Sequence, residues 1–272
     1  MKTFISRWVI LASAVCALGT AAAASAPDAA LTAAVADSAR TAAFVARDKA
    51  RHPAEELAFF GIKPNMTVVE LWPGGGYWTE ILGDYLHKGG GTYYVALNPP
   101  GDAEEDKGVV RWRARIAAQK ARLGTIHETS LGVGHFDIAP AGSADMVLTF
   151  RNLHNWMDGG YAEQALQACF TALKPGGILG IEEHRGRADK PQDPKAKDGY
   201  VREDYAVALA KKAGFVLVAS SPINANPKDT KDWVDGVWTL PPSLSQGDKD
   251  RDRYLAVGEA DNFVLKFQKP AR

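Results

Sequence analysis

Apolar residues along the chain change their spacing near residue 67. From Pro27 to Phe60 they recur at helical intervals in an alanine-rich segment that is interrupted at Pro53, which predicts two helices. Residues 68–71 then form a short, nearly continuous apolar run, which is typical of a strand buried on both faces. Glycines at 74–76 end this run, and apolar residues at helical spacing follow from Tyr77 to His87.

The alternation of short apolar runs and amphipathic segments continues to the end of the chain. It predicts strand 92–97, helix 109–123, strand 125–129, strand 144–150, helix 161–173, strand 178–183, helix 202–213, strand 215–220 and strand 262–268. Strands separated by helices form parallel crossover units, so we expect an α/β fold, doubly wound around a mostly parallel seven-stranded sheet. The last strand follows another strand without a clear helix, which suits an antiparallel edge.

The first 26 residues differ from the rest of the chain. Lys2 and Arg7 precede an apolar run from Trp8 to Leu18, and small residues follow from Ala21 to Ala26. This order is typical of a secretory signal peptide, and the run is shorter than the roughly 20 residues that a membrane span needs. We expect cleavage near Ala24 or Ala26, of which Pro27 makes the latter less favourable, and export to the periplasm without stable membrane insertion. Residues 27–272 would form one domain, with 27–60 as N-terminal helices and 222–260 as an insertion before the last strand.

Composition narrows the choice of partners and ligands. The 272 residues include 32 Lys plus Arg, 32 Asp plus Glu and two cysteines. A net charge of zero gives no long-range field for a polyanion, so we expect a small-molecule substrate and no nucleic acid. Cys169 lies in an apolar helical pattern and should be buried. No Cys/His set has zinc spacing, and His127 and His135 lack a partner at such spacing, so no metal site is predicted. The oligomeric state is unknown from sequence.

The candidate chemistry begins at the turn after the first strand. Glu70 lies near the strand's end, and Trp72-Pro73-Gly74-Gly75-Gly76 leads directly into the next helix. Such a turn places bare backbone and a helix N-terminus at the carboxyl end of the sheet, where ligands of open α/β sheets bind. A ligand site and a plain structural turn explain this segment equally well when it is taken alone.

Three segments, in order, resemble class I S-adenosylmethionine-dependent methyltransferases. They are ELWPGGGYWTEIL, SADMVLTFRNLHNW and LKPGGILGIEEHR, and the resemblance extends from about residue 53 to residue 268. The WPGGGYWTE form of the glycine motif is similar to that of exported, predicted methyltransferases. The resemblance implies a Rossmann-like methyltransferase fold and S-adenosylmethionine as the cofactor.

The resemblance also implies roles for single residues. Glu70 would help to hold the methionine end of the cofactor, and Gly74, Gly75 and Gly76 would let the backbone approach it. Asn98 stands where the family has an acid for the ribose hydroxyls, and Asp137 is a candidate for the adenine amine. Phe150 and Arg151 would border the methyl group. Trp72 stands where the family has its first glycine, so it would fill part of the cofactor cleft or stack on a ligand.

Substrate chemistry is expected where the fourth and fifth predicted strands end. His154 and His184 are the candidate bases, because an imidazole titrates close to neutral pH. Asn152, Trp156 and Glu183 are candidate substrate contacts at the same rim. Arg47 and Arg51 could cover the cofactor cleft, although a solvated helix face with an ion pair is the commoner case. Trp233 and Trp238 could line an apolar pocket or pin the insertion to the sheet.

The leading hypothesis is methyl transfer from S-adenosylmethionine to a small-molecule acceptor. The alternative is a non-catalytic module that binds another small ligand on the same fold, with a cleft narrowed by Trp72. A nicotinamide dehydrogenase fits poorly, since its fingerprint has spaced glycines and an acid after the second strand. Here Gly74–Gly76 are consecutive, and the second strand ends at Asn98.

Overall fold

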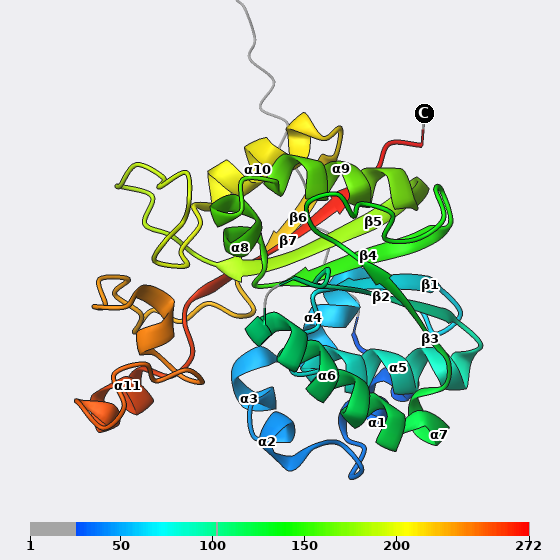
Figure 1. The fold of residues 1–272 in the computed structure, drawn as a ribbon, viewed down its shortest axis with the longest axis horizontal. Coiled ribbons are helices and arrows are strands. Elements are labelled where there is room, and N and C mark those ends of the chain that lie inside the picture. Colours follow the sequence, from blue (N-terminus) through cyan, green and yellow to red (C-terminus); the bar gives the residue numbers. More distant parts are fainter. Residues whose placement is uncertain (1–25, 102, 272) are drawn as a thin grey trace, which may run out of the picture.

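A seven-stranded sheet forms the centre of the protein (Figure 1). The computed structural model describes residues 26–101 and 103–271, so the predicted signal peptide, apart from its last residue, lies outside the described part. The strands are β1 (Thr67–Leu71), β2 (Thr92–Leu97), β3 (Ile126–Ser130), β4 (Ala144–Phe150), β5 (Leu173–His184), β6 (Val216–Ser221) and β7 (Asn262–Gln268). They lie in the order β3-β2-β1-β4-β5-β7-β6, and only the pairs with β7 are antiparallel. The predicted α/β fold with a mostly parallel seven-stranded sheet is confirmed.

The last strand is antiparallel, as predicted, but its predicted place at the sheet edge is wrong. β7 lies between β5 and β6, and β6 forms the edge. Phe263, Val264 and Leu265 on β7 are fully buried, whereas β6 exposes Val216 and Val218. A strand that is apolar on both faces is stabilised by neighbours on both sides, so burial explains why β7 takes the inner position.

Helices cover both faces of the sheet (Figure 1). One face carries α4 (Pro53–Phe60), α5 (Tyr77–Gly89) and α6 (Ala103–Ala118), and the other carries α8 (Leu153–Asp158), α9 (Ala162–Ala172) and α10 (Glu203–Lys212). The shorter helices are α1 (Ala29–Val35), α2 (Ala42–Val45), α3 (Asp48–Arg51), α7 (Lys120–Leu123), α11 (Arg251–Val257) and the 3₁₀ helix η1 (Gly236–Thr239). The N-terminal segment therefore holds four helices where two were predicted. His52 has a left-handed φ of 43°, which ends α3, and Pro53 begins α4.

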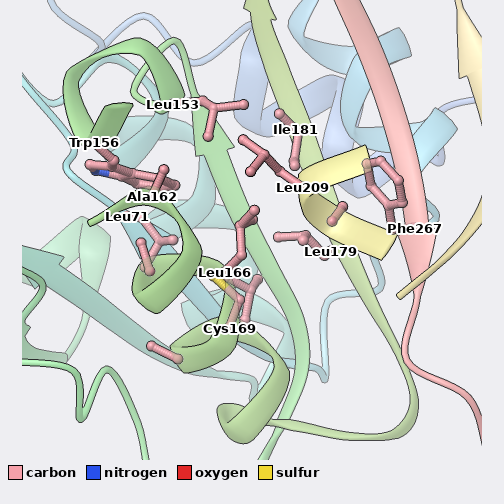
Figure 2. Packing of buried hydrophobic residues seen from close by; sticks show 14 of the residues in the cluster. Leu71, Leu153, Trp156, Ala162, Leu166, Cys169, Leu179, Ile181, Leu209 and Phe267 are labelled. Carbon is pink, nitrogen blue, oxygen red and sulfur yellow. The ribbon is translucent and has the colours of Figure 1, made fainter. Parts of the chain in front are cut away.

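The core on the α8–α10 side is closely packed (Figure 2). Leu166 and Cys169 on α9 face Leu179 and Ile181 on β5, and all four side chains are fully buried. Burial raises the pKa of the Cys169 thiol to about 12, so the thiol stays protonated at neutral pH. The prediction that Cys169 is a buried apolar residue is confirmed.

Residues 222–261 connect β6 to β7 beyond the carboxyl end of the sheet. They include η1 and α11, and with Tyr200 they form a small separate apolar cluster that contains Val237, Leu240, Tyr254 and Ala260. Figure 1 shows this segment to one side of the strands, near α2 and α3. Across residues 26–101 and 103–271, no helix combines the length and apolar character needed to cross a membrane.

Candidate functional site

The glycine turn joins β1 to α5 at the carboxyl edge of the sheet. Trp72, Gly74 and Gly76 have left-handed φ angles of 48°, 55° and 96°. A Cβ atom added to Gly74 would meet no heavy atom within 4 Å, so open space lies beside this backbone. A Cβ on Gly76 would instead lie 3.3 Å from the Trp112 ring. Gly74 therefore presents bare backbone to a ligand, whereas Gly76 serves close packing against α6.

Two cavities flank this turn and share Pro73, Gly74 and Gly75 as walls. The first, which we name the histidine cavity after His154 and His184, has a volume of about 440 Å³. The second, which we name the Asn98 cavity, lies between the turn, the end of β2 and α6, and has a volume of about 340 Å³. Both volumes fall within the range of small-molecule sites.

Glu70 is fully buried on β1 and lines the histidine cavity. Its Oε2 accepts hydrogen bonds from the Thr79 hydroxyl, at 2.7 Å, and from the Tyr93 hydroxyl. Its Oε1 has no partner among the described residues. Burial raises the pKa of the carboxyl to about 7, against the lowering effect of the two hydrogen bonds. A buried oxygen without a hydrogen-bond partner is unfavourable unless a ligand donates a hydrogen bond to it.

Trp78, in the first turn of α5, also lines this cavity and has an unpaired group. The ring is buried and stacks on Phe150, with centroids 3.9 Å apart and planes inclined by 15°. The indole Nε1 is buried and has no hydrogen-bond partner within the described part of the chain. Among the described residues that line the histidine cavity, Glu70 therefore has a buried unpaired acceptor and Trp78 a buried unpaired donor.

Trp72 forms part of the wall of the histidine cavity. Its Nε1 donates to the Leu131 carbonyl at 2.9 Å, and its ring meets Trp156 edge-on, with centroids 6.3 Å apart. These contacts hold the indole against the core on the α8 side and leave both cavities open. A left-handed φ on a bulky residue is uncommon and strained, in keeping with a position where the resembled family has glycine.

The residues after β4 combine a half-buried charge, on Arg151, with a structural tie, on Asn152. Arg151 has a left-handed φ of 61°, and its guanidinium lies 3.3 Å from the Glu182 carboxylate and 3.9 Å from that of Glu259. Asn152 donates to the Leu71 carbonyl at 2.9 Å, which ties the end of β4 to the end of β1. Both residues line the histidine cavity, although the Asn152 amide nitrogen is already engaged by the backbone.

Two imidazoles stand side by side in the histidine cavity. His154 Nδ1 lies 2.9 Å from Glu183 Oε1, His184 Nδ1 lies 2.8 Å from Asn262 Oδ1, and the ring centroids are 5.5 Å apart. Burial would raise the pKa of Glu183, but His154 and His184 bring it below its usual value. Burial lowers the pKa of His184 to about 4, despite the opposing effect of Glu183. At neutral pH, His184 is therefore neutral and Glu183 ionised.

Another wall comes from Glu259, which the sequence did not indicate, and from residues for which the sequence left two interpretations open. Arg47 and Arg51, on and beside α3, reach across the cavity to Glu259, with Nε atoms 2.7 and 3.1 Å from its carboxylate. Arg51 is buried, so the interpretation as a solvated helix face does not hold for it. Trp238 also lines the cavity, edge-on to His154 at 5.9 Å, whereas Trp233 packs in the small cluster of the connecting segment.

The structure brings together most of the residues singled out from sequence. The histidine cavity is lined by Glu70, Trp72, Gly74, Gly75, Phe150, Arg151, Asn152, His154 and His184. Asn98 is half-buried and lines the Asn98 cavity. Asp137 is exposed, Trp156 is buried in the core, and Glu183 is buried behind His154; none of these three lines either cavity.

Comparisons with known proteins identify the fold. No family model matches the chain, and a search of curated proteins also finds no match. A SAM-dependent methyltransferase from Aquifex aeolicus matches 82% of this chain and 93% of its own, with a TM-score of 0.54 and 15% identity. An arsenic(III) S-adenosylmethionine methyltransferase from Chlamydomonas reinhardtii matches 90% of this chain and 74% of its own, with a TM-score of 0.50 and 14% identity. The 4+2 cyclase SpnF matches 89% of this chain and 92% of its own, with a TM-score of 0.58 and 14% identity.

These similarities establish a Rossmann-like methyltransferase fold for this chain. At such low identity they establish the fold alone, and the cyclase shows that this architecture is found in proteins named for different reactions. The activity must therefore be argued from the site.

Proposed function

We propose that this protein binds S-adenosylmethionine across the glycine turn and transfers its methyl group to a small-molecule acceptor in the histidine cavity. The observation that carries the proposal is the unpaired, buried Oε1 of Glu70 in the cavity wall. The methionine end of the cofactor has an ammonium and a carboxylate. The ammonium would pair with Glu70, and the carboxylate could accept from the unpaired Nε1 of Trp78.

The nucleoside end would extend past Gly74 toward the Asn98 cavity. Gly74 and Gly75 belong to the walls of both cavities, and the space beside Gly74 is open. The Asn98 side chain could bond one ribose hydroxyl at a time, whereas a carboxylate could accept from both. We therefore expect weaker recognition of the nucleoside than of the methionine end.

The acceptor would lie against Trp238 and the two histidines. Bound S-adenosylmethionine supplies a methyl group that is already activated by its sulfonium sulfur. The protein must mainly align the acceptor and assist the loss of its proton. The aromatic rings of Phe150 and Trp238, beside polar nitrogen atoms, suit a small and partly apolar molecule with a hydroxyl or amine. The neutral net charge of the chain also favours a small acceptor over a polyanion.

Calorimetry of the mature protein with S-adenosylmethionine and S-adenosylhomocysteine tests the proposal. We expect both to bind, since they share the amino-acid end and the nucleoside. A known protein–ligand pair, measured at the same concentrations, serves as the positive control. If that pair gives a signal and neither S-adenosylmethionine nor S-adenosylhomocysteine gives heat with this protein, the proposal is overturned.

The second candidate is a non-catalytic ligand-binding module, and Trp72 is the observation that favours it. Its indole occupies a position where the resembled family has no side chain, which changes the wall that a cofactor would meet. Incubation with S-adenosylmethionine and a small-molecule extract separates the two. Methyl transfer releases S-adenosylhomocysteine, detectable by mass spectrometry, whereas the binding module releases none.

We also propose that the protein is exported to the periplasm and acts there without membrane insertion. The basic, apolar and small-residue order of the first 26 residues supports this proposal. N-terminal sequencing of the protein from a periplasmic fraction should find a start near residue 27. A cytosolic protein that begins at Met1 would contradict export.

A further inference from the structure

We propose that His154 and His184 form a binding site for a divalent transition-metal cation in the histidine cavity. Together with Glu183 they place potential ligand atoms within 4.8 Å of one another. His154 lies in α8, after β4, and His184 ends β5, so no local spacing in the sequence reveals the pair. The inference stands on these side chains and does not depend on which cofactor the glycine turn binds.

Hydrogen bonds fix the tautomer of His154. Glu183 Oε1 lies 2.9 Å from His154 Nδ1, and the same carboxylate accepts the backbone N–H groups of His154 and His184 at 3.2 and 2.8 Å. An ionised carboxylate is an acceptor only, so Nδ1 must carry the hydrogen. In the neutral ring, Nε2 then keeps its lone pair.

A different argument fixes the tautomer of His184. Asn262 Nδ2 donates to Glu182 Oε1 at 3.0 Å, so its Oδ1 is the atom that faces His184 Nδ1 at 2.8 Å. An amide oxygen accepts, and Nδ1 therefore donates. In the neutral ring, His184 Nε2 then keeps its lone pair, as His154 Nε2 does.

Both rings thus have the arrangement that metal ligands in proteins usually adopt. A ligating histidine normally donates its second ring N–H to a carboxylate or carbonyl oxygen, which orients the ring and makes the free nitrogen more basic. No protein group in the described part of the chain hydrogen-bonds to either Nε2, and both rings line the cavity. Imidazole nitrogen suits Zn²⁺, Co²⁺, Ni²⁺ or Fe²⁺. Two protein ligands leave positions for water or for an oxygen or nitrogen atom of the acceptor.

The surrounding charges permit a cation at this place. The Glu183 carboxylate lies directly behind His154, 2.9 Å from its Nδ1, and provides an acidic group beside the site. Three arginines also line the cavity, and each faces a carboxylate. Arg47 and Arg51 pair with Glu259 at 2.7 and 3.1 Å, and Arg151 lies 3.3 Å from Glu182. A bound cation would lower the pKa of a coordinated hydroxyl, which gives the site a direct use next to a methyl acceptor.

Cobalt titration of the chelator-treated mature protein tests the site. Co²⁺ bound to imidazole gives visible absorption bands that free aqueous Co²⁺ lacks at the same strength, so binding is read without any activity assay. We expect a saturable signal with one Co²⁺ per chain, displaced by Zn²⁺. His154→Asn and His184→Asn should each weaken binding at least ~10-fold, whereas His127→Asn should leave it unchanged. His127 is exposed on β3, stacks on Tyr94 and does not line the cavity.

Glu183→Gln is a further variant that separates loss of the metal site from loss of folding as the cause of weaker Co²⁺ binding. This variant keeps both imidazoles and should weaken Co²⁺ binding by roughly 10-fold or more, through the lost charge and the loosened His154 ring. Circular dichroism establishes that each variant is folded. Absence of a Co²⁺ signal in the wild type, or equal signals in the wild type and both folded histidine variants, would overturn the proposal. Calorimetry with S-adenosylmethionine on the metal-free protein tests the proposed function separately.

Discussion

The two cavities on either side of the glycine turn differ in how their polar groups are held. In the histidine cavity, Glu70 is fixed by Thr79 and Tyr93, and His154 is fixed by Glu183. In the Asn98 cavity, Asn98 is only half-buried and Arg111 is exposed. Preorganised groups away from water contribute more to binding and catalysis than mobile exposed ones. We therefore expect the histidine cavity to dominate affinity and chemistry, and the Asn98 cavity to adjust affinity.

The largest effect should come from Gly74, because it is a wall of both cavities. Gly74→Val would place a branched side chain in the open space and should weaken S-adenosylmethionine binding at least ~100-fold, measured by calorimetry. Part of any change will come from the left-handed φ of 55°, which disfavours a branched residue by roughly 1–2 kcal/mol.

Gly142→Val is the matched control for that strain. Gly142 has a φ of 64° and open space around its Cβ position, but it lies before β4, at the opposite edge of the sheet. Both variants should lose similar thermal stability, and only Gly74→Val should lose ligand binding. Equal binding by the two variants would show that the ligand does not pass this turn.

Glu70→Gln should produce the next largest effect. Loss of the charge opposite the ammonium group should weaken S-adenosylmethionine binding roughly 10- to 100-fold, since a hydrogen bond to a charged partner contributes about 1.5–3 kcal/mol. Asp137→Asn removes an exposed acid that lines neither cavity, and it should leave the affinity unchanged. A loss with Asp137→Asn and none with Glu70→Gln would reverse the assignment of the two acids.

The Glu70→Gln variant should also be more stable than the wild type above neutral pH. The pKa of Glu70 is raised from 4.5 to about 7 by burial, so between these values the unfolded carboxyl ionises while the folded one stays protonated. The contribution of Glu70 to the free energy of unfolding therefore falls as pH rises through this window. Glutamine cannot ionise and should avoid a loss of up to about 3 kcal/mol. Urea unfolding at pH 5 and pH 8 measures the difference, and parallel curves for the two proteins would contradict it.

The site residues at the ends of strands could be predicted from the sequence, because parallel strands bring their carboxyl ends to one edge of the sheet. Glu70, Phe150 and His184 lie far apart in the chain, yet each follows or ends a recognisable apolar run. Their convergence in one cavity needs only the topology. The strand order itself was less accessible: the place of β7 depended on how many of its faces are buried, which a count of strands does not reveal.

The rest of the cavity wall could not be inferred in this way. Arg47 and Glu259 are separated by most of the chain, and each lies outside the periodic strands and helices. Their pairing depends on the path of residues 222–261, for which the sequence has no repeating pattern. The case of Trp156 is different, since its place after β4 predicted a site residue but its apolar ring is buried against α9 and Trp72.

Trp78→Phe sharpens the comparison within the histidine cavity. Phenylalanine keeps a ring against Phe150 but removes the unpaired Nε1 donor, so S-adenosylmethionine binding should weaken by roughly 3- to 10-fold. Trp156→Phe is the matched control, because the Trp156 Nε1 is also buried with no partner among the described residues, but Trp156 lines neither cavity. Equal affinities for the two variants would mean that the Trp78 donor does not contact the ligand.

Asn98→Asp tests the Asn98 cavity, which we expect to contribute less to affinity, and should give the smallest effect. A carboxylate at the end of β2 could accept from both ribose hydroxyls, which should tighten S-adenosylmethionine binding by a few-fold, worth about 0.5–1 kcal/mol. The gain stays small because Asn98 is half-buried, so water competes for the new charge, and the exposed Arg111 in the same cavity wall screens it. Asn155→Asp adds the same charge to the wall of the histidine cavity, where no ribose is expected, and should not tighten binding. If both variants bind more tightly by the same factor, the gain reflects general attraction of a cationic ligand. If only Asn155→Asp does, the nucleoside occupies the histidine cavity and the assignment of the two sides must be exchanged.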